Sequence, residues 1–354
     1  MSILLDGTQG IDFNDGSNQS TAATPYARKN LIINGDMKIA QRSTSATGQS
    51  GYIAVDRFRC VGGSDAVDEL SLTHAQVTDA PDGFGNSYKI TVSTPETTLA
   101  ADEMIRIEHR MEGQNLQHLK KGTSNAEAVT LSFWIKGSVT GTYIVNIHDS
   151  DNARNIAKSY TINSANTWEY KTITFAGDTT GALDNDNAQS LTLYWYLGAG
   201  TNFTSGTLGT SWSAFTKANV AVGQTDILTT SGATWQITGC QLEVGDSASD
   251  FEFVPYDMEL ARCQRYYFVS DSTEVNYRYR SGSAVTTSYR PAPAFFPVTM
   301  RAAPTVTSTA TFSGNATGFT TASTTKNSVT FTWSESAANS FITIEAEYDA
   351  SAEL

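Results

Sequence analysis

The stretch that decides the fold is Val129-Thr-Leu-Ser-Phe-Trp-Ile-Lys136, in which apolar residues occupy every second position. Successive side chains of a β-strand point to opposite sides, so alternate residues share one face. Four apolar side chains would line one face of such a strand: Val129, Leu131, Phe133 and Ile135. The opposite face would carry polar side chains and Trp134. The stretch therefore predicts a strand that buries one side in a core.

The same alternation recurs on both sides of this stretch, with turns rich in Gly and Asn between the segments. It is found at 88–92, 104–112, 143–147, 168–175, 191–197 and 235–244. Many short strands of this kind predict a sandwich or a barrel. A sandwich is favoured, because each strand has a single apolar face. We therefore expect an all-β domain over residues 30–255.

The remainder of the chain divides into three parts. Residues 256–268 show rough helical spacing and predict a short helical connector. Residues 269–354 return to alternating segments and predict a smaller β-sandwich. Residues 1–29 are dominated by Gly, Asp, Asn, Ser and Thr, and predict an extended N-terminal arm.

The arm has few residues that could anchor it, namely Ile3, Leu4, Leu5, Ile11 and Phe13. Burying one such side chain stabilises by about 1.5–3 kcal/mol. Ordering the backbone costs about 1–2 kcal/mol for every residue. The arm is therefore expected to order only against a partner, for example as a strand added to another subunit. A flexible tail is the alternative.

The composition excludes several classes of protein. The chain has 354 residues, of which 17% are charged, and a formal net charge of -13. That charge would repel nucleic acid. No apolar run approaches the roughly 20 residues of a membrane span, and no signal peptide is apparent, so we expect synthesis in a cytoplasm without membrane insertion. Cys60, Cys240 and Cys263 are widely spaced, which indicates core residues rather than disulfides.

No catalytic signature is present. The sequence lacks a G-x-S-x-G elbow, a phosphate-binding loop and an H-E-x-x-H zinc motif. Carboxylates are plentiful, so a glycan-cleaving depolymerase remains an alternative. We expect the protein not to be an enzyme.

Aromatic side chains are the candidate glycan contacts, because a ring offers a large, rigid surface at little entropic cost. Trp134 and Trp195 are assigned to the faces opposite the inward aliphatic residues of their strands. Phe203 and Trp212 lie in the irregular segment 199–230, which is long enough to be functional. Packing in a core or a subunit interface is the alternative for all four.

Calcium is the only cofactor that the sequence suggests. Asp184-Asn-Asp186-Asn concentrates oxygen atoms in a short loop, and Asp184 and Asp186 are the candidate ligands. Ordinary turns in which Asp and Asn side chains bond to nearby backbone are the alternative.

Three blocks resemble the fibre and appendage proteins of tailed bacteriophages. They are Asn30-Leu-Ile-Ile-Asn-Gly-Asp36 with Gln41-Arg42 and Val55-Asp-Arg-Phe58; Ile237-Thr-Gly-Cys-Gln-Leu-Glu-Val-Gly245 with Phe251-Glu252, Pro255-Tyr256 and Cys263-Gln-Arg-Tyr-Tyr267; and Phe296-Pro-Val-Thr-Met-Arg-Ala-Ala-Pro304. The segment Gly10-Ile-Asp-Phe-Asn-Asp-Gly16 is also similar to one found in phage fibres. The middle domain resembles the jelly rolls of carbohydrate-binding modules.

The resemblance implies a structural virion protein made in a bacterial host. It implies a homotrimer, projecting from the tail as a fibre or similar appendage, with contacts to host surface glycans. The N-terminal arm would join it to other virion proteins. A head fibre or a capsid decoration protein is the alternative placement.

Overall fold

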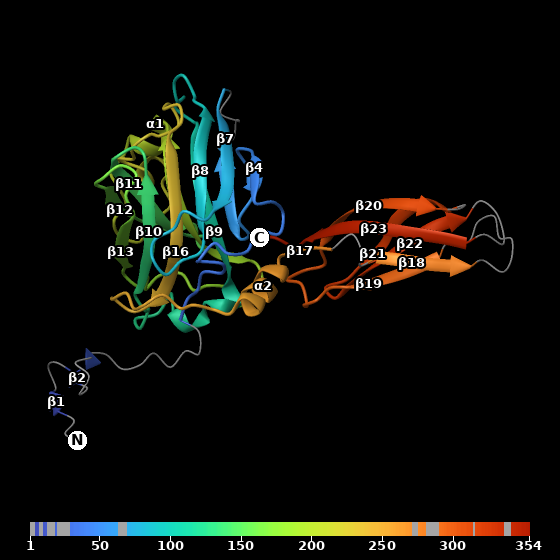
Figure 1. Ribbon diagram of the computed structural model, residues 1–354. Helices are drawn as coiled ribbons and strands as arrows, with labels where there is room; N and C mark the ends of the chain where they lie inside the picture. The colour runs from blue at the N-terminus through green and yellow to red at the C-terminus, as the bar shows by residue number, and fades with distance from the viewer. Residues whose placement is uncertain are drawn as a thin grey trace.

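The computed structural model describes residues 4–6, 10–12, 18–19, 29–62, 69–270, 275–280, 290–313, 316–335 and 341–354. Two stacked sheets form a large unit, and an elongated second unit projects from one side of it (Figure 1). Three short strands near the N-terminus pair antiparallel as β1 (Leu4–Asp6), β2 (Gly10–Asp12) and β3 (Asn18–Gln19).

Antiparallel strands make up both sheets of the large unit. The six-stranded sheet has the order β13 (Glu169–Phe175), β10 (Val129–Gly137), β16 (Thr234–Val244), β8 (Ser87–Thr94), β7 (Ser71–Val77) and β4 (Ser45–Thr47). The seven-stranded sheet has the order β15 (Ser213–Ala214), β12 (Arg154–Ile162), β11 (Gly141–Asp149), β14 (Gln189–Ala199), β9 (Met104–Glu112), β6 (Phe58–Gly62) and β5 (Gly51–Tyr52).

The chain crosses repeatedly between these two sheets, as it does in a jelly roll. β8 to β9, β9 to β10 and β10 to β11 are all crossings from one sheet to the other. Leu131, Phe133 and Ile135 of β10 are fully buried between the sheets, as the alternation predicts. The prediction of an all-β jelly-roll sandwich is confirmed.

The orientation predicted for Trp195 is wrong. Its side chain is 0% exposed and belongs to the main core, with Leu193 and Leu197 on the same face of β14. The reason is the two-residue period itself, since residues 193, 195 and 197 must share a face. The opposite face of β14 carries Tyr194 and Tyr196.

The segment 199–230 covers that opposite face. It contains α1 (Thr201–Thr204), β15 and the 3-10 turn η3 (Lys217–Asn219). Its apolar residues Phe203, Val220 and Ala221 pack on Tyr194 and Tyr196 as a separate cluster. The outer surface of the seven-stranded sheet is therefore partly closed.

Helices are few and short. The 3-10 turns η1 (Gly113–Asn115) and η2 (Gln117–Leu119) follow β9. The helix α2 (Tyr256–Gln264) joins the two units, with Asp257 and Glu259 in its first turn and Arg262 in its last. These charges suit the helix dipole. No helix among the described residues combines the length and apolar character needed to cross a membrane.

The second unit is a smaller sandwich, as predicted. One sheet holds β17 (Tyr267–Val269), β18 (Val275–Arg280), β20 (Thr305–Ser313) and β23 (Phe341–Ser351). The other has the order β19 (Arg290–Phe295), β22 (Ser328–Glu335) and β21 (Ala316–Thr324). Phe331 of β22 and Tyr348 of β23 meet between the sheets, with ring centroids 5.3 Å apart.

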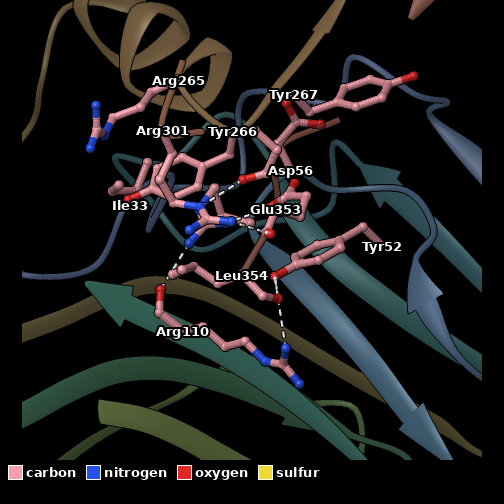
Figure 2. A network of polar contacts seen from close by, with 12 residues as sticks. Ile33, Tyr52, Asp56, Arg110, Arg265, Tyr266, Tyr267, Arg301, Glu353 and Leu354 are labelled. Atoms are coloured by element: carbon pink, nitrogen blue, oxygen red, sulfur yellow. Dashed lines mark hydrogen bonds and ion pairs between the residues drawn. The ribbon is translucent and has the colours of Figure 1, made fainter. Parts of the chain in front are cut away.

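The last residues of the chain return to the jelly roll instead of ending at the tip of the second unit (Figure 1). Figure 2 shows Glu353 and Leu354 among side chains of the jelly roll and of the connector after α2. The Glu353 carboxylate pairs with Arg57 and with Arg42. Arg110 donates to the Leu354 carbonyl over 2.6 Å. We call residues 351–354 with these partners the C-terminal clasp.

Candidate functional site

A groove lies on the outer face of the six-stranded sheet. Its volume is about 620 Å³. Strands β10, β13 and β16 form its floor, and segments 82–84 and 250–253 form a wall. The lining residues are Asp82, Gly83, Phe84, Ser132, Trp134, Tyr170, Gly239, Asp250, Phe251 and Phe253. We call it the aromatic groove.

Five rings line the aromatic groove in two groups. Phe84, Phe251 and Phe253 form a triad with centroids 4.9–5.2 Å apart. Trp134 and Tyr170 are cross-strand neighbours with centroids 5.3 Å apart. Phe253 is 57% exposed and Tyr170 45% exposed, so large aromatic surfaces face the solvent. Exposed apolar surface rimmed by polar groups is typical of a binding site.

Gly239 brings the two groups of rings together. It lies at a β-bulge, where the pairing of β10 with β16 shifts between Ser132 and Trp134. Its φ of 62° is left-handed. A Cβ at this position would lie 2.8 Å from Phe84 Cζ and 3.1 Å from Trp134 Cδ1. A side chain at residue 239 would therefore have to push the Phe84 and Trp134 rings aside.

Polar groups accompany the rings. Asp82 and Asp250 are exposed at the groove, and Ser132 is buried in its floor. On the same sheet face, Lys136 pairs with Asp79 and its Nζ lies 5.1 Å from the centre of the Trp168 ring. The hydrogen bond from Lys136 holds the pKa of Asp79 below its ordinary value. Rings beside hydrogen-bonding groups are what a sugar needs, because its hydroxyls bond while its ring faces stack.

Of the four predicted aromatic contacts, the structure places only Trp134 in this groove. Trp195 is in the core, and Phe203 is 6% exposed under the Nζ of Lys217. Trp212 donates from Nε1 to the Ala176 carbonyl over 2.7 Å, away from the groove lining.

The sequence pattern did not identify four of the aromatic residues that line the groove: Phe84, Tyr170, Phe251 and Phe253. Tyr170 had a local signal, since it is outward in β13, directly opposite Trp134. The other three come from irregular segments, where no period indicates which way a side chain points.

The candidate calcium ligands make local bonds. Asp186 Oδ1 accepts from the Ala188 backbone N–H over 2.9 Å, which is an Asx turn. The Asp184 backbone N–H donates to Asp151 Oδ2 over 2.9 Å. Across the described ranges, no group of three or more His, Cys, Asp or Glu side chains is placed to hold a metal ion. The calcium assignment stays a prediction.

A cage of oxygen atoms elsewhere surrounds an internal cation. The Lys121 ammonium contacts Asp149 and Asp178 and donates to the carbonyls of Thr180 and Gly181. The Lys121 side chain is only 5% exposed. The amino group thus takes the position that a bound cation would take among these oxygens.

The proposed anchoring residues cannot be placed. Ile3 and Phe13 lie outside the described residues, and the strands at Leu4, Leu5 and Ile11 are described without their side chains. The three cysteines are free and buried.

No protein-family model matches this chain, and no curated protein matches it significantly. Solved structures similar to it include the enzymatically active domain of bacteriophage CBA120 tailspike protein 4, at 11% identity and a TM-score of 0.32 over 61% of this chain and 21% of that one. They also include a putative sugar binding protein from Bacteroides thetaiotaomicron, at 13% identity and a TM-score of 0.34 over 61% of this chain and 100% of that one. The module TmCBM61, solved with β-1,4-galactotriose, has 9% identity and a TM-score of 0.31 over 62% of this chain and 100% of that one.

This chain thus spans about a fifth of the tailspike domain. At this degree of similarity, these structures identify no ligand or activity for it.

Proposed function

We propose that this protein is a glycan-binding component of a bacteriophage virion and that the aromatic groove is its binding site. The groove itself carries the proposal, because five rings and two carboxylates converge on one exposed sheet face. Stacking on Trp134 and Tyr170 would hold a sugar ring, and Asp82 and Asp250 would accept bonds from its hydroxyls.

Binding of the full chain to a glycan array tests this proposal. Tyr170→Ala should weaken binding about tenfold, since a packed aromatic anchor is commonly worth more than 1 kcal/mol. Phe215→Ala is the matched control. Phe215 is 40% exposed but packs against His148 of the other sheet, so its removal should leave binding unchanged. No binding to any glycan, or equal losses in both variants, would contradict the proposal.

The placement in a virion is supported by the three sequence blocks that resemble phage fibres. We propose a homotrimeric tail fibre or similar appendage, joined to the particle through residues 1–29. A chain lacking these residues should form soluble oligomers that no longer enter particles; normal incorporation would refute the anchoring role. Electron microscopy of particles carrying a tagged copy distinguishes a tail fibre from a head fibre.

We propose that the protein is not an enzyme. A depolymerase is the second candidate, because a glycosidase needs two carboxyl groups beside the scissile bond and the groove contains Asp82 and Asp250. Incubation with host polysaccharide should release no new reducing ends. Sustained release that Asp82→Asn or Asp250→Asn abolishes would establish the enzyme instead.

A further inference from the structure

We propose that the aromatic groove selects uncharged glycans and rejects anionic ones. This inference rests on the proposed function and names the class of ligand for the same site. Its basis is the placement of charged groups around the rings.

The groove contains carboxylates that have no counter-ion. Asp82 and Asp250 are both exposed, one on each of the two segments that carry the phenylalanine triad. In the described part of the chain, neither carboxylate accepts a hydrogen bond or joins an ion pair. No lysine or arginine is among the residues that line the groove. A ligand would therefore meet two negative charges directly.

Two lysines beside the groove are already engaged. Lys136 pairs with Asp79, on the sheet face beside the groove. Lys29 donates from Nζ to Ser249 Oγ over 2.7 Å and to the Asp250 carbonyl, while its backbone N–H donates to the Glu252 carboxylate. Recruiting either ammonium to an acidic sugar would break these bonds. Neither provides a ready partner for an anion.

These charges affect neutral and acidic sugars in opposite ways. The hydroxyls of an uncharged sugar donate to a carboxylate, and a charged acceptor strengthens such a bond. A uronate or a sulfated sugar at the same place would put like charges side by side without a cation between them, which disfavours the wrong ligand. The net charge of -13 adds a long-range repulsion. Selectivity should therefore arise from charge, while the rings supply affinity to both kinds of sugar.

The test uses glycans matched in linkage. Oligogalactosides are compared with oligogalacturonides, cello-oligosaccharides with their glucuronate counterparts, and host surface polysaccharide with the same material after its carboxyl groups are reduced to alcohols. EDTA is present throughout, so that no divalent cation bridges two carboxylates. The uncharged member of each bound pair should bind at least about tenfold more tightly.

Two double variants separate charge from structure. Asp82→Asn with Asp250→Asn should bring the ratio of the affinities for the uncharged and the acidic glycan close to one. Each amide keeps an acceptor but has no charge. Asp102→Asn with Asp257→Asn changes the net charge equally at positions outside the groove lining, and should keep the wild-type ratio. Tyr170→Ala should weaken both members of a pair alike.

The outcomes are distinguishable. Equal or tighter binding of the acidic member, or an unchanged ratio in the groove double variant, would overturn the selectivity while leaving the glycan-binding function intact. Failure of every glycan to bind would overturn the proposed function, and this inference with it.

Discussion

At the residue scale, Gly239 lies between the two groups of rings that line the aromatic groove. It combines a left-handed backbone with close approach of Phe84 and Trp134. Gly232 has a similar φ of 72°, but nothing lies within 4 Å of the position of its missing Cβ. Comparing substitutions at these two glycines therefore separates the cost of a left-handed backbone from the effect of crowding the rings.

We expect Gly232→Ala to lower the free energy of unfolding by about 1 kcal/mol, because it forces alanine into a left-handed conformation, and Gly239→Ala to lower it by at least as much. Only Gly239→Ala should also weaken glycan binding, since its methyl group must displace the Phe84 ring. Urea unfolding and titration with an array-identified glycan measure the two effects. Equal binding by both variants would show that Gly239 has no part in the groove.

His74 is a buried titratable residue of the jelly-roll core. Its Nε2–H donates to the Gly48 carbonyl over 2.9 Å, so Nδ1 accepts from the Tyr88 hydroxyl over 2.6 Å. Burial lowers the pKa of His74 to about 4. The ring is therefore neutral in the folded protein at pH values where it would be protonated in the unfolded chain.

Stability should consequently fall as the pH drops from about 6.5 to about 4, because the unfolded chain binds the extra proton in that window. The contribution of His74 is at most about 3 kcal/mol. Urea unfolding at pH 7 and pH 4.5 should show a smaller pH dependence in His74→Gln than in the wild type. Burial also lowers the pKa of the half-buried His118, so His118→Gln should flatten the pH dependence too, but less than His74→Gln does. An identical slope in His74→Gln and the wild type would disprove the assignment.

At the element scale, the oxygen cage around Lys121 joins three loops. Lys121 follows η2, Asp149 ends β11, and Asp178 follows β13. Burial alone would raise the pKa of Asp178, but hydrogen bonds from Arg154 and Lys121 lower it. Asp178 therefore stays ionised beside the ammonium. Removing the ammonium would leave two buried negative charges facing each other.

Lys121→Met should thus destabilise the protein by about 3–5 kcal/mol, the usual cost of breaking a buried ion pair. Two carboxylates and two carbonyls would then surround a vacant position of a kind that suits calcium. Addition of 5 mM CaCl₂ should raise the Tm of Lys121→Met and leave that of the wild type unchanged.

The stabilisation by calcium should be confined to the variant that lacks the Lys121 ammonium. Lys171→Met is the control, because that lysine pairs with Glu169 at a sheet edge and calcium should not rescue its loss. If calcium left the Tm of Lys121→Met unaltered, the four oxygens would not form a cation cage.

At the scale of the whole molecule, the C-terminal clasp ties the second sandwich to the jelly roll. Arg301 donates to the carbonyls of Ala352 and Glu353 and to that of Asn187 over 2.7–2.9 Å. Arg57, 0% exposed, stacks 3.5 Å from the centre of the Tyr266 ring and pairs with Glu353. Strand β23 is therefore held at the junction by partners from both units (Figure 2).

Glu353→Gln should weaken the attachment of the two units to each other by a free energy of about 2–3 kcal/mol, because it leaves the buried Arg57 charge without its counter-ion. We expect thermal unfolding to separate into two transitions and small-angle scattering to report a broader range of shapes. Glu347→Gln makes the same chemical change at an exposed position within β23, and should retain the single transition. A single, unshifted transition in Glu353→Gln would mean that the clasp does not couple the units.

The local alternation of apolar and polar residues was enough to predict much of this architecture. The alternation in 129–136 fixed a strand, its inward face and the class of fold, because burial on one side of a sheet requires a two-residue period. The same rule would also have placed Trp195 inward, next to Leu193 and Leu197. Trp134 could be recognised as outward for the same local reason.

Sequence alone determined the strands and their inward faces; tertiary packing decided which outward faces remain open. Tyr194 and Tyr196 are as outward in β14 as Trp134 is in β10, yet segment 199–230 covers the two tyrosines, whereas Trp134 stays half-buried and lines the open groove. The phenylalanine triad and the clasp join residues far apart in the chain. No period encodes such contacts, because they depend on how loops and sheets pack after the strands have formed.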